Sequence, residues 1–252
     1  MLSNISNKND QPRQAHAVLD LTSRRIKAQK IELLLKLNKI DTENKIKILE
    51  IGCGSGGISH YFATHTKLDC EVTAVDIHDN RLVKSGYTFI HVDSTVLPFD
   101  DHFFDLIISN HVIEHVGNIE NQQQHLDEIF RVSKNQSTVY LAAPNRWMLI
   151  EPHYKLIFLS WLPQKWRTPY LKLSKKGTHY DCEPPSLGKL EQLINSSGFD
   201  YTNLSMEATL LFLEMERKNS FIHKLIKLLP IKLFNLLKPI IPTLIYKLKV
   251  KK

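Results

Sequence analysis

Apolar residues follow two different patterns along this chain, one typical of buried strands and one typical of helices with a single apolar face. Short runs rich in apolar residues occur at residues 46–51, 70–76, 87–92, 104–108 and 138–143. Helical spacing of apolar residues occurs at residues 15–40, from residue 57 onward, and at residues 119–133 and 186–197. Strands that alternate with helices in this way predict an α/β fold built on a parallel sheet. An antiparallel strand pair is predicted at about 200–206 and 209–215.

The first predicted strand ends at a glycine-rich turn, and a helix begins directly after it. Gly52, Gly54 and Gly57 fit the pattern G-x-G-x-x-G, which is typical of dinucleotide sites. Glu50 and Gly56, together with Gly52 and Gly54, also fit E-x-G-x-G-x-G. Glycine allows a backbone with positive φ and leaves no Cβ to block a ligand. The turn therefore predicts a nucleoside site at the start of this helix.

Acidic residues end the next two predicted strands. Asp76 follows Gly57 by 19 residues, where a carboxylate accepts hydrogen bonds from ribose hydroxyls in several nucleotide-binding folds. Asp93 ends the third strand, and Leu97-Pro98-Phe99 comes shortly after it. Asp76 indicates a nucleoside ligand without distinguishing a dinucleotide from another nucleoside.

The arrangement V-D-x-x-x-L-P-F, followed by F-D-L-I-x-S, resembles the class I S-adenosylmethionine (SAM)-dependent methyltransferases, in particular the broad methyltransferase type 11 group. The resemblance covers roughly residues 45–145. It implies a Rossmann-like sheet of seven strands in the order 3-2-1-4-5-7-6, with the seventh strand antiparallel. It also implies that Asp93 accepts from the adenine amine and that SAM is the cofactor. The predicted cofactor-binding residues are Glu50, Gly52, Cys53, Gly54, Gly56, Asp76, Ile77, Asp93, Ser94 and Asn110.

The residues from His111 to His115 form H-x-x-E-H, a zinc signature of one group of proteases. Here the motif follows a strand of a nucleotide-binding fold, and no protease framework accompanies it. Quinone-ring O-methyltransferases resemble this stretch, and some bind a divalent metal through E-x-x-E-H. His111 stands in place of the first glutamate, so we predict no metal. His115 is expected to order the cofactor loop, with acid/base catalysis as the alternative.

An aromatic insert at about 146–182 follows the fifth strand, where we expect the acceptor to bind. The insert is predicted to be a lid that contacts a membrane, or alternatively a core helix. His153 and His179 flank it. Because neutral imidazole accepts protons near pH 7, the catalytic candidates are His115, His153 and His179.

The chain of 252 residues has a net charge of +7 that is concentrated at its C-terminal end. Residues 218–252 contain nine lysines and no acidic residue, so the rest of the chain has a charge of −2. This nearly neutral body argues against a nucleic-acid-binding protein. Three separate cysteines (Cys53, Cys70, Cys182) form no disulfide framework and indicate a reducing compartment.

These features divide the chain into three parts. Residues 1–14 are polar, lack the apolar core of a signal peptide and are predicted to be disordered. Residues 15–216 are predicted to form the methyltransferase domain, and 217–252 a basic amphipathic tail. The longest uncharged run of the tail, 239–246, is far shorter than the roughly 20 residues of a spanning helix. The tail is predicted to lie on an anionic membrane, or alternatively to pack on protein.

The resemblance implies an enzyme that transfers a methyl group from SAM to a small or amphiphilic acceptor. Oxygen is the expected acceptor atom, in a lipid-linked glycan or a quinone precursor. The protein is expected in the cytoplasm, in peripheral contact with the inner face of the membrane. Two alternatives remain open from the sequence, an NAD-dependent oxidoreductase and a non-catalytic membrane-associated protein that binds SAM.

Overall fold

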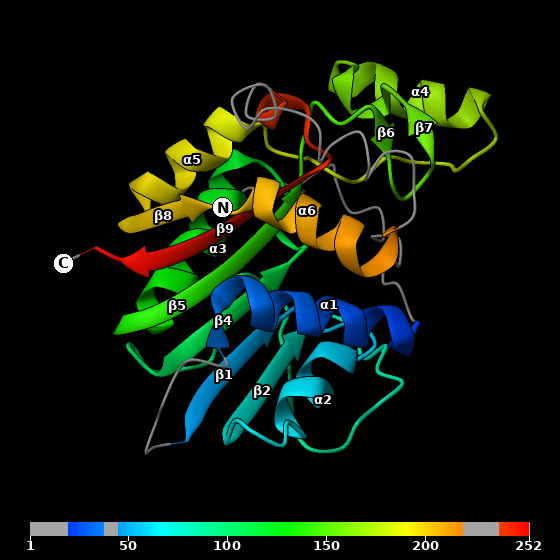
Figure 1. Ribbon diagram of the computed structural model, residues 1–252. Helices are drawn as coiled ribbons and strands as arrows, with labels where there is room; N and C mark the ends of the chain where they lie inside the picture. The colour runs from blue at the N-terminus through cyan, green and yellow to red at the C-terminus, as the bar shows by residue number, and fades with distance from the viewer. Residues whose placement is uncertain (1–19, 38–44, 219–236, 252) are drawn as a thin grey trace, which may run out of the picture.

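A sheet of seven strands forms the centre of the computed structural model, which describes residues 20–37, 45–218 and 237–251 (Figure 1). The strand order is β3-β2-β1-β4-β5-β9-β8. Strand β9 is antiparallel to both of its neighbours, and the other pairs are parallel. The predicted α/β sheet, with its order and its antiparallel seventh strand, is thus confirmed. The strands are β1 (Ile46–Ile51), β2 (Cys70–Asp76), β3 (Thr88–His91), β4 (Phe104–Asn110), β5 (Ser133–Pro144), β8 (Phe199–Asn203) and β9 (Thr243–Val250).

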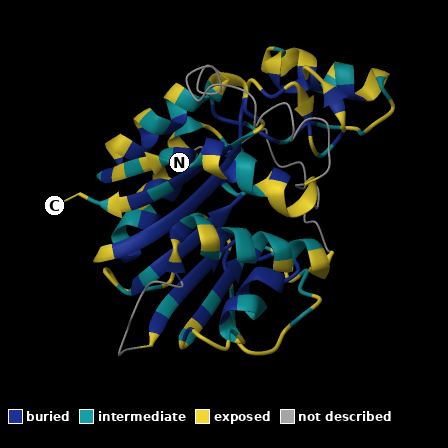
Figure 2. Cartoon of the chain, in the orientation of Figure 1, coloured by how far each residue is buried: buried dark blue, intermediate teal, exposed yellow. Residues whose placement is uncertain are grey.

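Helices cover both faces of this sheet. On one face lie α1 (Leu21–Leu35), α2 (Gly57–Ala63) and α6 (Ser205–Glu216), which pack on Ile48, Val72 and Ile108 (Figure 1). On the other face lie α3 (Ile119–Val132) and α5 (Leu187–Ser196), which pack on alternate strand residues such as Leu49 and Ile107. Figure 2 shows the strands buried between the two layers. Burial on both faces explains why the strands appear as continuous apolar runs in the sequence.

The strand register brings several loops together at one edge of the sheet. Ile51 of β1 lies opposite Val75 of β2 on one side and Ser109 of β4 on the other. The chain leaves β1 toward one side of the sheet and β4 toward the other, so a crevice forms beyond these strand ends. Open α/β sheets bind ligands at this switch point.

The prediction of a strand at 209–215 is wrong, because these residues belong to helix α6. The segment is rich in Glu, Met, Leu and Ala, which are strong helix formers, and Met206, Ala208 and Leu213 are buried along it. The seventh strand is instead β9, within the segment predicted to be a basic tail. Residues 243–250 therefore belong to the sheet, and the predicted domain boundary after residue 216 excluded a strand of the fold. Residues 219–236 and 252 of the predicted amphipathic tail lie outside the described residues.

The aromatic insert forms a separate layer above the strand ends rather than one core helix (Figure 1). It contains a hairpin of β6 (Ile150–Glu151) and β7 (Leu156–Ile157), the short helix η3 (Leu159–Trp161) and helix α4 (Gln164–Leu173). We call residues 146–182 the lid. Its own small core consists of Tyr154, Leu156, Leu159, Leu171, Tyr180 and Cys182. Because this core is small, many of the apolar residues of the lid remain on the surface.

Candidate active site

The glycine turn after β1 adopts a backbone that other residues disfavour. Gly52, Gly54 and Gly56 have φ angles of 72°, 51° and 77°. A Cβ on Gly52 would lie 2.5 Å from a methyl carbon of Val112, and one on Gly56 would lie 2.0 Å from the hydroxyl oxygen of Tyr87. Glycine is therefore required at both positions. The turn leaves bare backbone at the edge of the crevice.

Asp76 holds this turn against the end of β2. Its Oδ2 accepts a hydrogen bond of 2.8 Å from the Gly54 N–H, and its Oδ1 accepts one of 3.1 Å from the His78 N–H. The Gly52 N–H also donates to the carbonyl oxygen of Val75 at 2.8 Å. The carboxylate is therefore fixed beside the glycine turn, where lone pairs remain for a ligand hydroxyl.

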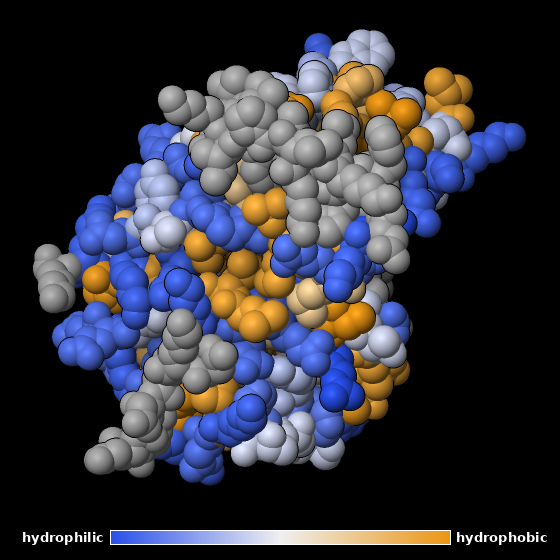
Figure 3. Space-filling model, in the orientation of Figure 1, coloured by the Kyte–Doolittle hydropathy of each residue, from blue (hydrophilic) through white to orange (hydrophobic). Residues whose placement is uncertain are grey.

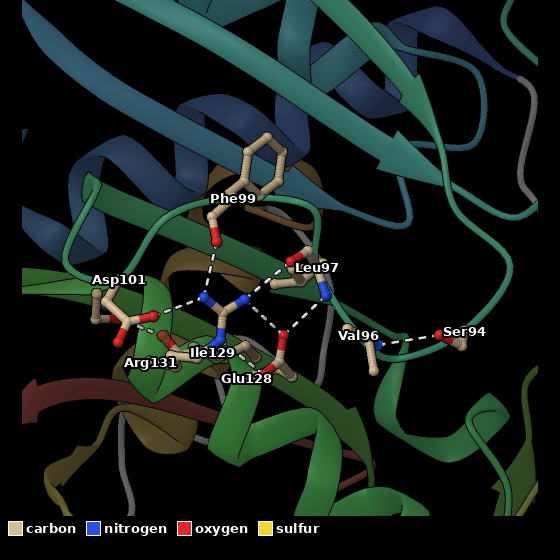
Figure 4. A network of polar contacts seen from close by, with 9 residues as sticks. Ser94, Val96, Leu97, Phe99, Asp101, Glu128, Ile129 and Arg131 are labelled. Atoms are coloured by element: carbon tan, nitrogen blue, oxygen red, sulfur yellow. Dashed lines mark hydrogen bonds and ion pairs between the residues drawn. The ribbon is translucent and has the colours of Figure 1, made fainter.

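An ionic network on helix α3 holds the loop after β3 in place (Figure 4). The guanidinium of Arg131 donates to the carbonyl oxygens of Leu97 and Phe99, at 2.8 and 2.7 Å. Glu128 pairs with Arg131 and accepts from the Leu97 N–H at 2.8 Å. These contacts place Leu97 in the cavity wall and leave Asp93 exposed at the rim.

A cavity of about 1140 Å³ joins these elements at the strand ends. This volume exceeds that of a pocket for a single small ligand, so a cofactor and an acceptor fit together. Two of its polar atoms, Asn110 Oδ1 and Ser55 Oγ, are buried without a hydrogen-bond partner among the described residues. Nine of the ten predicted cofactor-binding residues line it: Glu50, Gly52, Cys53, Gly54, Asp76, Ile77, Asp93, Ser94 and Asn110. The tenth, Gly56, does not line the cavity and shapes the turn instead.

Helix α1 covers one side of this cavity with two cations that the sequence did not single out. Arg24 and Lys27 line the wall beside Glu50. Burial lowers the pKa of Lys27 to about 8, assisted by the nearby positive charges of Lys30 and Arg24. Their helical spacing was visible in the sequence, but nothing there indicated which face of the helix would meet the ligand.

Glu50 is almost fully buried at the end of β1, where the Ser59 hydroxyl donates to its carboxyl group. Burial raises its pKa to about 8, although the hydrogen bonds from Ser59 and the charge of Arg24 oppose the shift. The unfolded chain loses this proton near pH 4.5, whereas the folded chain retains it up to about pH 8. Folding stability should therefore fall as the pH rises through this window.

We expect Glu50→Gln to remove this pH dependence in the protein without ligand. Between about pH 5 and 8, the melting temperature of the wild type should fall relative to that of the variant. Each pH unit of the window corresponds to about 1.4 kcal/mol of unfolding free energy. Differential scanning fluorimetry measures both curves, and Glu71→Gln, at an exposed position of β2, is the matched control. Parallel curves for wild type and Glu50→Gln would contradict the buried, protonated carboxyl group.

A cluster of histidines and acidic residues lies at the lid end of the cavity. His115 and His153 both line it, and their ring centroids are 5.6 Å apart. His153 Nδ1 lies 2.6 Å from Glu151 Oε1. Burial lowers the pKa of His153, but the hydrogen bond and charge of Glu151 outweigh burial and leave the pKa above its ordinary value. Two of the three predicted catalytic histidines are thus brought together.

The third candidate, His179, lies elsewhere in the lid and does not line the cavity. Its Nδ1 lies 3.5 Å from Thr168 Oγ1, and its backbone oxygen accepts from the Tyr154 hydroxyl at 3.2 Å. Glu151 and Cys182 belong to the cluster and were not predicted. Neither residue lies in a recognisable motif, so only the fold of the lid places them beside His115 and His153.

Part of this chain is similar in sequence to known methyltransferases. A family profile described as "Methyltransferase domain" matches residues 49–141. Malonyl-[acyl-carrier protein] O-methyltransferase of Buchnera aphidicola subsp. Baizongia pistaciae is 32% identical over 111 residues, which cover 42% of this chain and 42% of that protein. Fatty-acid O-methyltransferase of Mycolicibacterium smegmatis is 35% identical over 75 residues, which cover 27% of this chain and 27% of that protein. The chain thus spans less than half the length of both relatives.

The fold is also similar to that of solved methyltransferases. The structure of phosphoethanolamine N-methyltransferase 2 of Haemonchus contortus in complex with S-adenosyl-L-methionine aligns with a TM-score of 0.54. Sequence identity is 16%, and the alignment covers 89% of this chain and 52% of that chain. At this identity the comparison concerns the fold.

Proposed function

Since this chain belongs to the class I SAM-dependent methyltransferases, we propose that it transfers the methyl group of SAM to an oxygen atom of a small amphiphilic acceptor. The observation that carries this proposal is one cavity that joins the glycine turn to His115 and to His153 of the lid. One end of the cavity suits a nucleoside and the other offers imidazoles to an acceptor.

The residues at the first end fit SAM. The backbone of Gly52 and Gly54 would lie against the amino-acid tail and ribose, and Asp76 would accept from the ribose hydroxyls. Asp93 at the rim would accept from the adenine amine. The buried Asn110 Oδ1, which has no partner among the described residues, would accept from a ligand N–H. Leaving such an atom unpaired costs about 1 to 3 kcal/mol, which a ligand would recover.

SAM, when bound, supplies a methyl group on a positively charged sulfonium that needs little further activation. The protein has to align the acceptor oxygen with that carbon, and alignment accounts for most of the rate. His153 is the proposed general base. Glu151 orients its ring through Nδ1, and the imidazole would take the acceptor proton as the O–CH3 bond forms and the S–CH3 bond breaks.

The surface of the lid supports an amphiphilic acceptor. Figure 3 shows apolar side chains on the outside of the lid beside hydrophilic ones. The exposed apolar residues there are Trp147, Leu149, Ile150, Ile157, Phe158, Trp161, Trp166 and Leu173. Exposed apolar patches of this kind mark contacts with lipids or proteins. Two relatives named for malonyl-acyl carrier protein and fatty-acid O-methylation also favour an acceptor with an acyl chain. Within the described ranges, no helix is long and apolar enough to cross a membrane.

Methyl transfer from radiolabelled SAM to fatty acids, lipid-linked sugars and quinone precursors tests this function. With an active acceptor, His153→Gln should lower turnover by about 100-fold, which is typical for loss of a general base. Binding of S-adenosylhomocysteine should be unchanged, because His153 lies at the acceptor end. His179→Gln, outside the cavity wall, is the matched control and should keep full activity. Equal losses in both variants would contradict the assignment of the base, and no transfer to any acceptor class would contradict the proposed acceptor.

A further inference from the structure

Three side chains with metal-binding atoms, two of them from the lid, converge beside the cavity wall. His115 Nδ1 lies 3.7 Å from Cys182 Sγ, and Cys182 Sγ lies 3.7 Å from Asp181 Oδ1. The ligand atoms of these three residues all lie within 4.8 Å of one another. Cys182 is buried and the other two are half-buried, so the lid largely shields the cluster from solvent.

The separation between His115 and Cys182 matches that of two ligands of a tetrahedral zinc ion. Bonds of about 2.0 Å from zinc to imidazole nitrogen and about 2.3 Å to thiolate sulfur place the nitrogen and the sulfur about 3.5 Å apart. The observed separation between His115 and Cys182 is 3.7 Å. Imidazole nitrogen, thiolate sulfur and carboxylate oxygen are each donors that zinc accepts.

A buried carboxylate lies near His115. Glu114 Oε1 lies 3.9 Å from His115 Nε2, on the ring atom that does not face Cys182. This distance is too long for a hydrogen bond, and the same oxygen lies 3.2 Å from His111 Nδ1, so Glu114 acts on His115 through its charge. Glu114 is fully buried, and its second oxygen has no hydrogen-bond partner among the described residues. Buried negative charge around the cluster favours a cation within it.

A second group, Glu151, His153 and Cys182, is also close enough to share an ion. However, His153 Nδ1 and Glu151 Oε1 are 2.6 Å apart. That distance is a hydrogen bond and is too short for two ligand atoms of one tetrahedral ion. The first group is therefore the better site, and His153 remains the proposed base.

We propose that His115, Asp181 and Cys182 bind one divalent cation of the zinc type at the acceptor end of the cavity. Binding breaks the S–H bond of Cys182, forms a metal–thiolate bond and releases the proton to solvent. Three protein ligands leave a fourth position for water or for an acceptor oxygen. The prediction of no metal considered only the H-x-x-E-H motif. Two of the proposed ligands, Asp181 and Cys182, lie far along the chain from His115, outside that motif.

Cobalt(II) titration of the chelator-treated protein tests the site, because a cobalt–thiolate bond gives a charge-transfer band in the near ultraviolet. Wild type should show this band with one equivalent of cobalt, and zinc should abolish it by displacing the cobalt. Cys182→Ser should lose the band, whereas Cys70→Ser, at a half-buried position on β2, should keep it. Zinc affinity, measured by calorimetry, should fall at least about 100-fold in Cys182→Ser.

Two results would overturn the proposal: a wild type without the band, and a Cys182→Ser variant that keeps it. If circular dichroism shows that the serine variant does not fold, Asp181→Asn tests the proposed ligand set. Asp181 is half-buried and the thiol remains in this variant, so the band should persist while zinc binds about tenfold more weakly. Unchanged zinc affinity in Asp181→Asn would overturn the assigned ligand set. None of these readings depends on methyl transfer.

Discussion

A chain that ends at residue 242 should fail to fold. It lacks β9, which lies between β5 and β8 and is paired with both. Leu244, Tyr246 and Leu248 of this strand are fully buried. Each such side chain contributes about 1.5 to 3 kcal/mol, so the loss approaches the entire stability of a typical domain. The truncated chain should be insoluble or show no cooperative thermal transition, whereas the full chain should show one.

A chain that ends at residue 250 is the matched control, because it keeps all of β9. It should melt within a few degrees of the full chain. A soluble chain ending at 242 with an unchanged melting temperature would contradict the position of β9 in the sheet. The same reasoning rules out deletion of residues 218–252 as a test of membrane binding, since the deletion would remove a strand of the sheet.

Asp76→Ala should abolish measurable binding of S-adenosylhomocysteine. The carboxylate is placed to accept from ribose hydroxyls, and each hydrogen bond to a charged group contributes about 1.5 to 3 kcal/mol. Loss of two such bonds weakens binding by at least about 100-fold. The Gly54 N–H, which donates to Asp76 at 2.8 Å, would also lose its acceptor. The glycine turn should therefore become less ordered in the variant.

Isothermal titration calorimetry measures this effect, with thermal melting to confirm that the variant is folded. Asp79→Ala is the matched control, because Asp79 lies in the same loop, pairs with Arg81 and does not line the cavity. It should bind like the wild type. Equal affinity in wild type and Asp76→Ala would contradict the assigned ribose contact. A wild type that binds NAD in place of S-adenosylhomocysteine would contradict the proposed cofactor and favour the oxidoreductase alternative.

Much of the fold could be predicted because local sequence determines it. The strand, glycine turn and helix at residues 46–63 show their apolar pattern and backbone requirements within a few neighbouring residues. The pairing of β9 could not be predicted in this way. Its eight residues contain lysines at 247 and 249 and follow two prolines, so composition suggested a basic tail. Only long-range pairing with β5 and β8 makes them a strand.

The two ends of the cavity also differ in how far the sequence alone predicts them. Asp76 and Asp93 could be placed at one edge of the sheet because Asp76 ends β2 and Asp93 follows β3, and parallel strand ends share one edge of a sheet. No comparable rule predicts which residues of the lid come together. His153 and Cys182 meet His115 only because the hairpin and α4 fold back over the strand ends, and His179, equally prominent in the sequence, lies outside the cavity wall.

Ribosomes make the chain from its N-terminus, so β8 is synthesised well before the strand that separates it from β5. Until residues 243–250 have left the exit tunnel, β5 has an unpaired edge and β8 has no neighbour in the sheet. An unpaired apolar strand readily pairs with other chains. The nascent protein is therefore exposed to aggregation until its last strand emerges, and its yield in cells should depend on chaperones that cover this edge.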